Sequence, residues 1–145
     1  IVNKFFQHGV KNNQVIFLDR AKKFIDHLEL YYKIDLALDT FPYPGVTTSF
    51  EAILMGVPVL TMRGFNLNSR CGESIIKNLG LPELIAEDEN DYYKKAIYLM
   101  NKNHLSKVSG LKLREKAISS PLFDTVTFAK NFEKIIEQTF NKINK

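Results

Sequence analysis

The stretch from Asp35 to Thr61, DLALDTFPYPGVTTSFEAILMGVPVLT, constrains the fold more than any other part of the chain. It begins with a short apolar run, Leu36 to Leu38, of the kind that a strand buried on both faces needs. The run ends at Asp39, and residues 40–46 then hold two prolines and a glycine, which excludes a helix or a central strand there. The stretch therefore starts as a strand that runs into a loop.

A helix and a second strand are expected after this loop. The hydroxyl of Thr47 or Thr48 is expected to cap the first free N–H groups of the helix, and Gly56 to end it ahead of a strand over Val57–Thr61. This order indicates an α/β fold and places a helix N-terminus, with its positive dipole end, directly after a strand and a glycine loop. Such an N-terminus either binds an anion, usually phosphate, or binds nothing, and the pattern alone favours the second alternative.

Periodicity predicts the remaining elements. They are a helix near the start of the chain, a strand over Val15–Leu18, a helix over Phe24–Lys33, a helix from Ser69 closed by Gly80, a strand over Leu84–Ala86, a helix through Met100, a helix over residues 104–117, and a last helix from Asp124 or Thr125. The last helix carries an apolar stripe that predicts core packing: Phe128, Phe132, Ile135, Ile136 and Phe140.

Length and composition limit the class of protein. A chain of 145 residues with 45% hydrophobic and 25% charged residues is ordinary for one globular domain, residues 1–145. The net charge of +4 does not indicate nucleic-acid binding, because the lysines are spread along the chain among Asp and Glu. The single cysteine, Cys71, excludes an internal disulfide, and no run approaches the roughly 18 apolar residues of a membrane helix. We expect a cytoplasmic protein without nucleic-acid or membrane partners.

Most catalytic motifs are absent from the sequence. One cysteine and three scattered histidines (His8, His27 and His104) argue against a zinc site. There is no GxSxG, no GxGxxG and no lysine after a phosphate-binding glycine loop. Asp35 and Asp39 lie four apart on one strand face, where a carboxylate pair is conceivable, but a hydrogen bond that closes the following loop is the favoured role of Asp39.

Several motifs occur together, in order, along most of the chain. They are LDTFPYPGVTTSFEAILMGVPVLTMRG, NSRCGESII, NLGLPELIAED, DYYKKAIYL and ISSPLFD. Together they resemble the C-terminal half of the O-linked N-acetylglucosamine transferase and SPINDLY family, over roughly Val15 to Phe140. The resemblance implies an α/β fold with a Rossmann-like parallel sheet flanked by helices, the nucleotide-sugar-binding C-terminal domain of a GT-B glycosyltransferase. In that family tetratricopeptide repeats usually precede the two-domain enzyme, so residues 1–145 are expected to be a fragment of a longer chain. The final helix of GT-B enzymes crosses back to the other domain, so the alternative to core packing is that part of the apolar stripe of the last helix lacks its partner here.

The resemblance assigns ligand contacts to two residues that the pattern leaves open. His27 borders an apolar helix face, where a lone histidine is usually packed or solvated. In the family, a histidine at this spacing before the LDT motif lies against the nucleotide, so His27 is assigned to the nucleotide through its ring face. Arg70 matches the arginine of the family's SR pair. Two alternatives for it are equally supported: contact with a phosphate or with the other domain, and a surface residue of a helix.

The resemblance also assigns the glycine loop and the helix start to the diphosphate. The N–H groups and hydroxyls of Thr47 and Thr48 are expected to stabilise the negative charge that builds on the diphosphate, with Gly45 letting the backbone approach closely. No metal or other cofactor is expected. Glu51 matches the family's acidic residue that holds the ribose hydroxyls; the alternative is a capping box, because Thr48 and Glu51 have its spacing.

Two departures and one gap qualify the resemblance. Val46 stands where animal members have a histidine, and Glu51 where they have an aspartate. The family's phosphate-binding lysine, acceptor-binding histidine and peptide-binding surfaces lie upstream of Ile1, so no catalytic residue is expected in this chain.

The implied function is donor binding for the transfer of a sugar, N-acetylglucosamine from UDP-N-acetylglucosamine, to Ser or Thr hydroxyls. The acceptor protein or peptide would bind through the upstream half, and this chain alone is expected to bind nucleotide weakly and to catalyse little. The alternatives are a related donor such as GDP-fucose and a non-catalytic interaction module that retains the fold.

Overall fold

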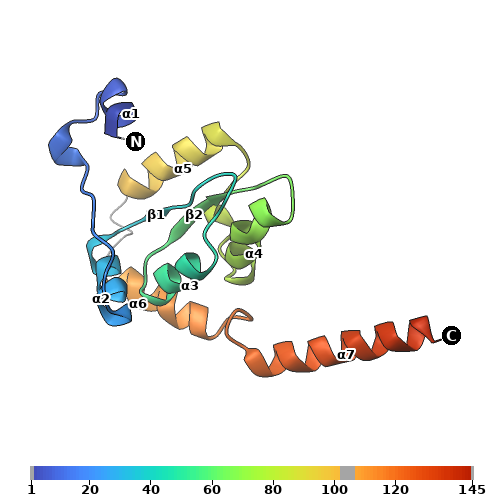
Figure 1. Ribbon diagram of the computed structural model, residues 1–145. Coiled ribbons are helices and arrows are strands. Elements are labelled where there is room, and N and C mark those ends of the chain that lie inside the picture. The colour runs from blue at the N-terminus through green and yellow to red at the C-terminus, as the bar shows by residue number, and fades with distance from the viewer. Residues whose placement is uncertain (1, 102–106, 145) are drawn as a thin grey trace.

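The computed structural model describes residues 2–101 and 107–144 and consists of a small parallel sheet with helices around it (Figure 1). The strands are β1 (Ala37–Leu38), β2 (Val59–Met62) and β3 (Ile85–Ala86), in that order across the sheet. The helices are α1 (Val2–Gln7), α2 (Phe24–Glu29), α3 (Thr47–Leu54), α4 (Cys71–Asn78), α5 (Glu89–Asn101), α6 (Lys107–Ile118) and α7 (Thr125–Ile143). Short 3-10 helices are η1 (Asn12–Gln14), η2 (Leu30–Lys33), η3 (Asn68–Arg70) and η4 (Pro82–Leu84).

The connections between strands place two loops at one edge of the sheet. Ala37 of β1 pairs with Val59 of β2, and Thr61 of β2 pairs with Ile85 of β3, both in parallel. Parallel strands need crossover connections, which α3 and α4 supply. In Figure 1, α5 lies on one side of the strands and α3 with α6 on the other. Because the carboxyl ends of the strands share an edge, the loops after β1 and β2 lie beside each other there, where open α/β sheets bind ligands.

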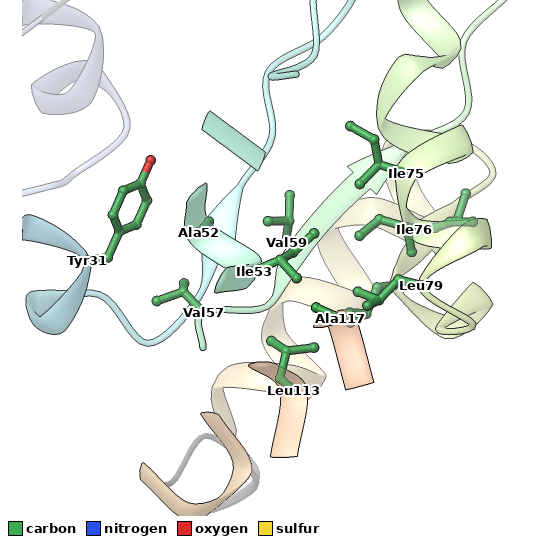
Figure 2. Close-up of a cluster of buried hydrophobic side chains, with 12 residues drawn as sticks. Tyr31, Ala52, Ile53, Val57, Val59, Ile75, Ile76, Leu79, Leu113 and Ala117 are labelled. Carbon is green, nitrogen blue, oxygen red and sulfur yellow. The ribbon is translucent and has the colours of Figure 1, made fainter. Parts of the chain in front are cut away.

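The core lies between the sheet and helices α3, α4 and α6 (Figure 2). Ile53, Ile76 and Leu79 are almost fully buried within it. Burying side chains of this size stabilises the fold by roughly 1.5–3 kcal/mol each. Tyr31 is the polar member of this cluster and stands at its edge in Figure 2.

Two glycines end helices as predicted. Gly56 and Gly80 have φ of 81° and 71°, a region that other residues rarely adopt. At the end of α3, Gly56 N donates to Ile53 O and Val57 N donates to Ala52 O, which satisfies two carbonyls of the last turn. The chain then turns directly into β2, so the predicted order of strand, loop, helix and strand is confirmed.

Two local predictions are wrong. Val15–Leu18 forms no strand: Ile16 and Phe17 are exposed, because an apolar run becomes a strand only when a neighbouring strand accepts its hydrogen bonds. The expected threonine cap is also absent, since α3 already begins at Thr47 and its N-cap is Val46, which has no polar side chain. The expected start of the next-to-last helix, His104, lies outside the described residues.

The predicted core packing of the last helix is wrong as well. None of the residues of α7 is buried, and Phe128 and Phe140 are each about two-thirds exposed. The helix projects away from the rest of the molecule in Figure 1. Asp124 caps it as expected, accepting from Thr127 N at 3.0 Å. Neither α7 nor any other helix of the described ranges has the length and apolar character needed to cross a membrane.

Candidate functional site

The loop between β1 and α3 is shaped by Asp39. Its Oδ1 accepts from Gly45 N at 2.6 Å and from Thr40 N at 3.1 Å, and its Oδ2 accepts from the buried Thr61 hydroxyl at 2.9 Å. Burial raises the pKa of Asp39, although the bonds from Gly45, Thr61 and Thr40 act in the opposite direction. The loop-closing role predicted for Asp39 is therefore confirmed.

Gly45 makes room for the first turn of α3. A Cβ at this position would lie 2.5 Å from Thr48 Oγ1 and 2.8 Å from Ser49 Oγ, so any larger residue would displace these hydroxyls. The Gly45 N–H is already bonded to Asp39, so Gly45 serves the site by its small size and not as a donor.

The N-terminus of α3 presents unpaired donors to solvent. Thr47 and Thr48 are exposed and their N–H groups have no acceptor among the described hydrogen bonds, whereas Ser49 N and Phe50 N donate to Val46 O. The N-cap Val46 provides no side-chain acceptor, and the first turn carries no acidic residue. The positive end of this helix is therefore left without a counter-charge from the helix itself.

One turn further along, Glu51 meets His27. His27 Nε2 lies 2.9 Å from Glu51 Oε2, with the imidazole 39% and the carboxylate 15% exposed. A carboxylate only accepts hydrogen bonds, so Nε2 carries the hydrogen and donates. Glu51 therefore turns toward α2 and does not close the capping box with Thr48 that was the alternative to a ribose contact.

Tyr31 of η2 completes this group. Its hydroxyl lies 3.2 Å from Glu51 Oε2 and 3.2 Å from the Thr48 carbonyl oxygen, and its ring meets that of His27 edge to face at 5.6 Å. Burial, followed by the charge of Glu51, raises the pKa of Tyr31 to about 12. Tyr31 lies within the helix predicted over Phe24–Lys33, and periodicity by itself gives it no role in a site. The signal that would have found it is that a buried tyrosine hydroxyl needs a hydrogen-bond partner.

Arg70 belongs to a different cluster. Its Nε donates to Glu73 Oε2 at 2.7 Å, and Glu73 Oε1 accepts from Lys77 Nζ at 2.6 Å and from Arg63 Nε at 3.1 Å. The Glu73 side chain is only 3% exposed. The hydrogen bond from Arg70, aided by Lys77, lowers the pKa of Glu73 to about 2. Arg70 thus has a structural ion pair, and its phosphate or interdomain role remains a prediction.

An open cavity of about 670 Å³ lies along η3 and α4, lined by Phe65, Leu67, Arg70 and Lys77 among others. None of its lining residues comes from α3 or α2. Its two cationic side chains already pair with Glu73. The start of α3, with the free N–H groups of Thr47 and Thr48, is therefore the better candidate for a ligand site than this cavity.

Comparison with known proteins identifies the fold and the family. The sequence profile described as Glycosyl transferase family 41 matches residues 1–132. The chain belongs to this family.

Named members of the family are similar over nearly all of the chain. "Probable UDP-N-acetylglucosamine--peptide N-acetylglucosaminyltransferase SPINDLY" of Solanum lycopersicum is 39% identical over 138 residues, which cover 94% of this chain and 15% of that protein. The similarly named SEC protein of Arabidopsis thaliana is 32% identical over 135 residues, 92% of this chain and 14% of that protein. The chain thus spans about one-seventh of the length of these relatives.

A solved structure confirms the fold class. A mutant of the Thermobaculum terrenum O-GlcNAc transferase superposes with a TM-score of 0.84 at 31% identity, over 94% of this chain and 26% of that chain. The predicted α/β, GT-B type fold with a parallel sheet flanked by helices is therefore correct.

Proposed function

We propose that this family 41 chain is the donor-binding half of a glycosyltransferase that takes a sugar from a nucleoside diphosphate and transfers it to protein Ser or Thr hydroxyls. The observation that carries the proposal is that α3 combines an uncapped N-terminus at Thr47 with Glu51 one turn further on, whose carboxylate is bonded to His27 of α2. Four residues of helix span roughly 6 Å, about the distance from a diphosphate to the ribose attached to it.

Each part of this helix suits one part of the donor. The exposed N–H groups and hydroxyls of Thr47 and Thr48 can donate to the diphosphate, and the helix dipole favours the charge that builds on it as the glycosidic bond breaks. This stabilisation needs no metal or cofactor. Because Glu51 Oε2 is bonded to His27 and Tyr31, Oε1 is the oxygen that we propose to accept from the ribose hydroxyls, and the ring face of His27 is proposed to lie against the nucleotide.

The donor is proposed to be UDP-N-acetylglucosamine. The support is that the names of the SPINDLY and SEC relatives carry this nucleotide sugar, and that the first turn of α3 carries no acidic residue to repel a diphosphate. The acceptor protein would bind through parts of the longer enzyme. We also propose that this enzyme acts in the cytoplasm.

Nucleotide titration tests the proposal. UDP added to the 15N-labelled chain is expected to shift the amide signals of Thr47 and Thr48 in a saturable way, with an affinity in the millimolar range, and to raise the melting temperature. GDP is expected to bind more weakly. Absence of any saturable shift with UDP, GDP or their sugars at millimolar concentration would contradict the proposal and favour a non-catalytic interaction module.

A variant of the helix start separates binding from stability. Thr47→Ala combined with Thr48→Ala is expected to weaken UDP binding about tenfold, because two hydroxyl donors are lost. Both side chains are exposed, so the free energy of unfolding should change by less than about 0.5 kcal/mol. Ser74→Ala, an exposed hydroxyl on α4, is the control and should leave the affinity unchanged. An unchanged affinity in the double variant would count against the assigned role of α3.

A further inference from the structure

We propose that Tyr31 is a positioning residue for the nucleotide: its hydroxyl fixes the Glu51 carboxylate and the first turn of α3 together, and so sets the geometry of the nucleoside end of the site. This inference rests on the proposed function. The resemblance and the relatives' names assign Tyr31 nothing.

The geometry shows that Tyr31 joins two elements distant in sequence. Tyr31 lies in η2, whereas its two acceptors, Thr48 O and Glu51 Oε2, lie in α3, 17 and 20 residues further on. Thr48 O belongs to the turn that bears the exposed donors, and Glu51 Oε2 is the same oxygen that holds His27. One hydroxyl therefore links the part of the site assigned to the diphosphate with the part assigned to the nucleoside.

The surroundings of Tyr31 suit a fixed donor. The residue is 9% exposed and packs in the core cluster, so its ring has little freedom to move. A tyrosine hydroxyl is protonated at neutral pH, and the pKa of Tyr31, raised to about 12 by burial and by Glu51, extends this into the alkaline range. Without this hydroxyl, His27 would be the remaining partner of Glu51 Oε2 among the described contacts, and the carboxylate could rotate about its terminal bond.

The test is the affinity of the chain for UDP after Tyr31→Phe, which keeps the ring and removes the hydroxyl. UDP binding is expected to weaken about fivefold. Inorganic pyrophosphate, which has no nucleoside, should lose clearly less affinity than UDP, because the helical hydrogen bonds of α3 still hold its first turn; an equal loss for both ligands would overturn the role at the nucleoside end. Tyr32→Phe is the matched control, because the neighbouring tyrosine is 75% exposed, and it should bind UDP as the unaltered chain does.

A double variant tests whether Tyr31 acts through Glu51. Glu51→Ala, which removes the acceptor of the Tyr31 hydroxyl, is expected to weaken UDP binding by itself, and adding Tyr31→Phe to it should weaken binding by less than twofold more. Additive losses would overturn the positioning role, because Tyr31 would then affect UDP binding independently of Glu51. If the unaltered chain bound no UDP, the proposed function itself would fail; if UDP bound equally to Tyr31→Phe, only the role of Tyr31 would.

A measurement on the unaltered chain guards against a variant that does not fold. In chains labelled with 13C-tyrosine, UDP should shift the Cζ signal of Tyr31, which bears the bonded hydroxyl, and leave that of Tyr32 in place. A shift of the His27 ring signals without any shift at Tyr31 would contradict the proposal.

Discussion

The two loops that follow β1 and β2 both connect a strand to a helix, but the helix first turns that they lead into differ in charge. Each follows a strand and leads into an eight-residue helix, α3 after β1 and α4 after β2. The first turn of α3 has neither a side-chain cap nor an acidic residue. The first turn of α4 contains Glu73, buried and bonded to three cationic side chains.

The loop before α4 is also satisfied from within. Ser69 Oγ accepts from Phe65 N and Asn66 N, and Asn66 Oδ1 accepts from Ser69 N, so side chains of the loop take up its own donors. The loop before α3 is closed in the same way by Asp39, which accepts from Gly45 N and Thr40 N, and the difference lies in the first turn, where Thr47 N and Thr48 N have no acceptor among the described hydrogen bonds. A helix N-terminus can therefore bind an anion only where the protein's own side chains leave its N–H groups and its positive dipole end without partners.

The largest expected effect comes from removing the charge that compensates α4. Glu73→Ala should lower the free energy of unfolding by about 2 kcal/mol, because Arg63, Arg70 and Lys77 lose their shared partner. The cost is kept moderate by the 40–51% exposure of these three side chains. Urea unfolding measures it, with the exposed Glu83→Ala as the control. A loss no greater than that of the control would show that the α4 turn does not depend on Glu73.

Substituting one glycine in each loop tests which of the two loops contributes to UDP binding. Gly45→Ala should weaken UDP binding about tenfold at a stability cost of about 1 kcal/mol, because the new methyl displaces the Thr48 and Ser49 hydroxyls. Gly64→Ala brings a Cβ to 2.2 Å from Ser69 Oγ, so it should destabilise the fold and leave the UDP affinity of the folded chain unchanged. Equal losses of affinity in both variants would remove the functional distinction between the loops.

The smallest expected effect is a pH dependence of the unfolding free energy that appears only in acid, where Glu73 becomes protonated. The folded-state pKa of Glu73, about 2, lies below its ordinary value of 4.5, so the ionised form is favoured in the folded protein. Its contribution to stability is fully present above pH 4.5 and is lost as the pH falls toward 2. The difference in unfolding free energy between the unaltered chain and Glu73→Gln should therefore be constant from pH 7 to 5 and shrink below pH 4.5. A difference that stays constant down to pH 2 would contradict the assigned pKa.

Local features of the chain were predictable, whereas contacts between distant residues were not. The order of strand, loop, helix and strand around Gly56 follows from residue preferences within a few positions, and so does the loop-closing bond of Asp39. Val15–Leu18 has the composition of a strand but no strand pairing, because composition does not supply a neighbour.

The candidate site divides in the same way. Thr47 and Thr48 were found as residues at a helix start, although the exact first residue was misplaced by the expected cap. The hydrogen bond from Tyr31 to Glu51 joins residues 20 positions apart and depends on how η2 packs on α3. The periodicity of the sequence does not predict this packing. The spacing of Glu73 with Arg70 and Lys77, three and four residues apart, was visible in the sequence; the third partner, Arg63, was not.

The exposure of α7 also determines how the chain unfolds. A 19-residue helix without a buried residue adds little to the cooperative core, so its stability is close to that of an isolated peptide helix. Its amide hydrogens should therefore exchange with solvent by local fraying, whereas those of β2 should wait for global opening. In this chain the helix and the sheet are separate cooperative units.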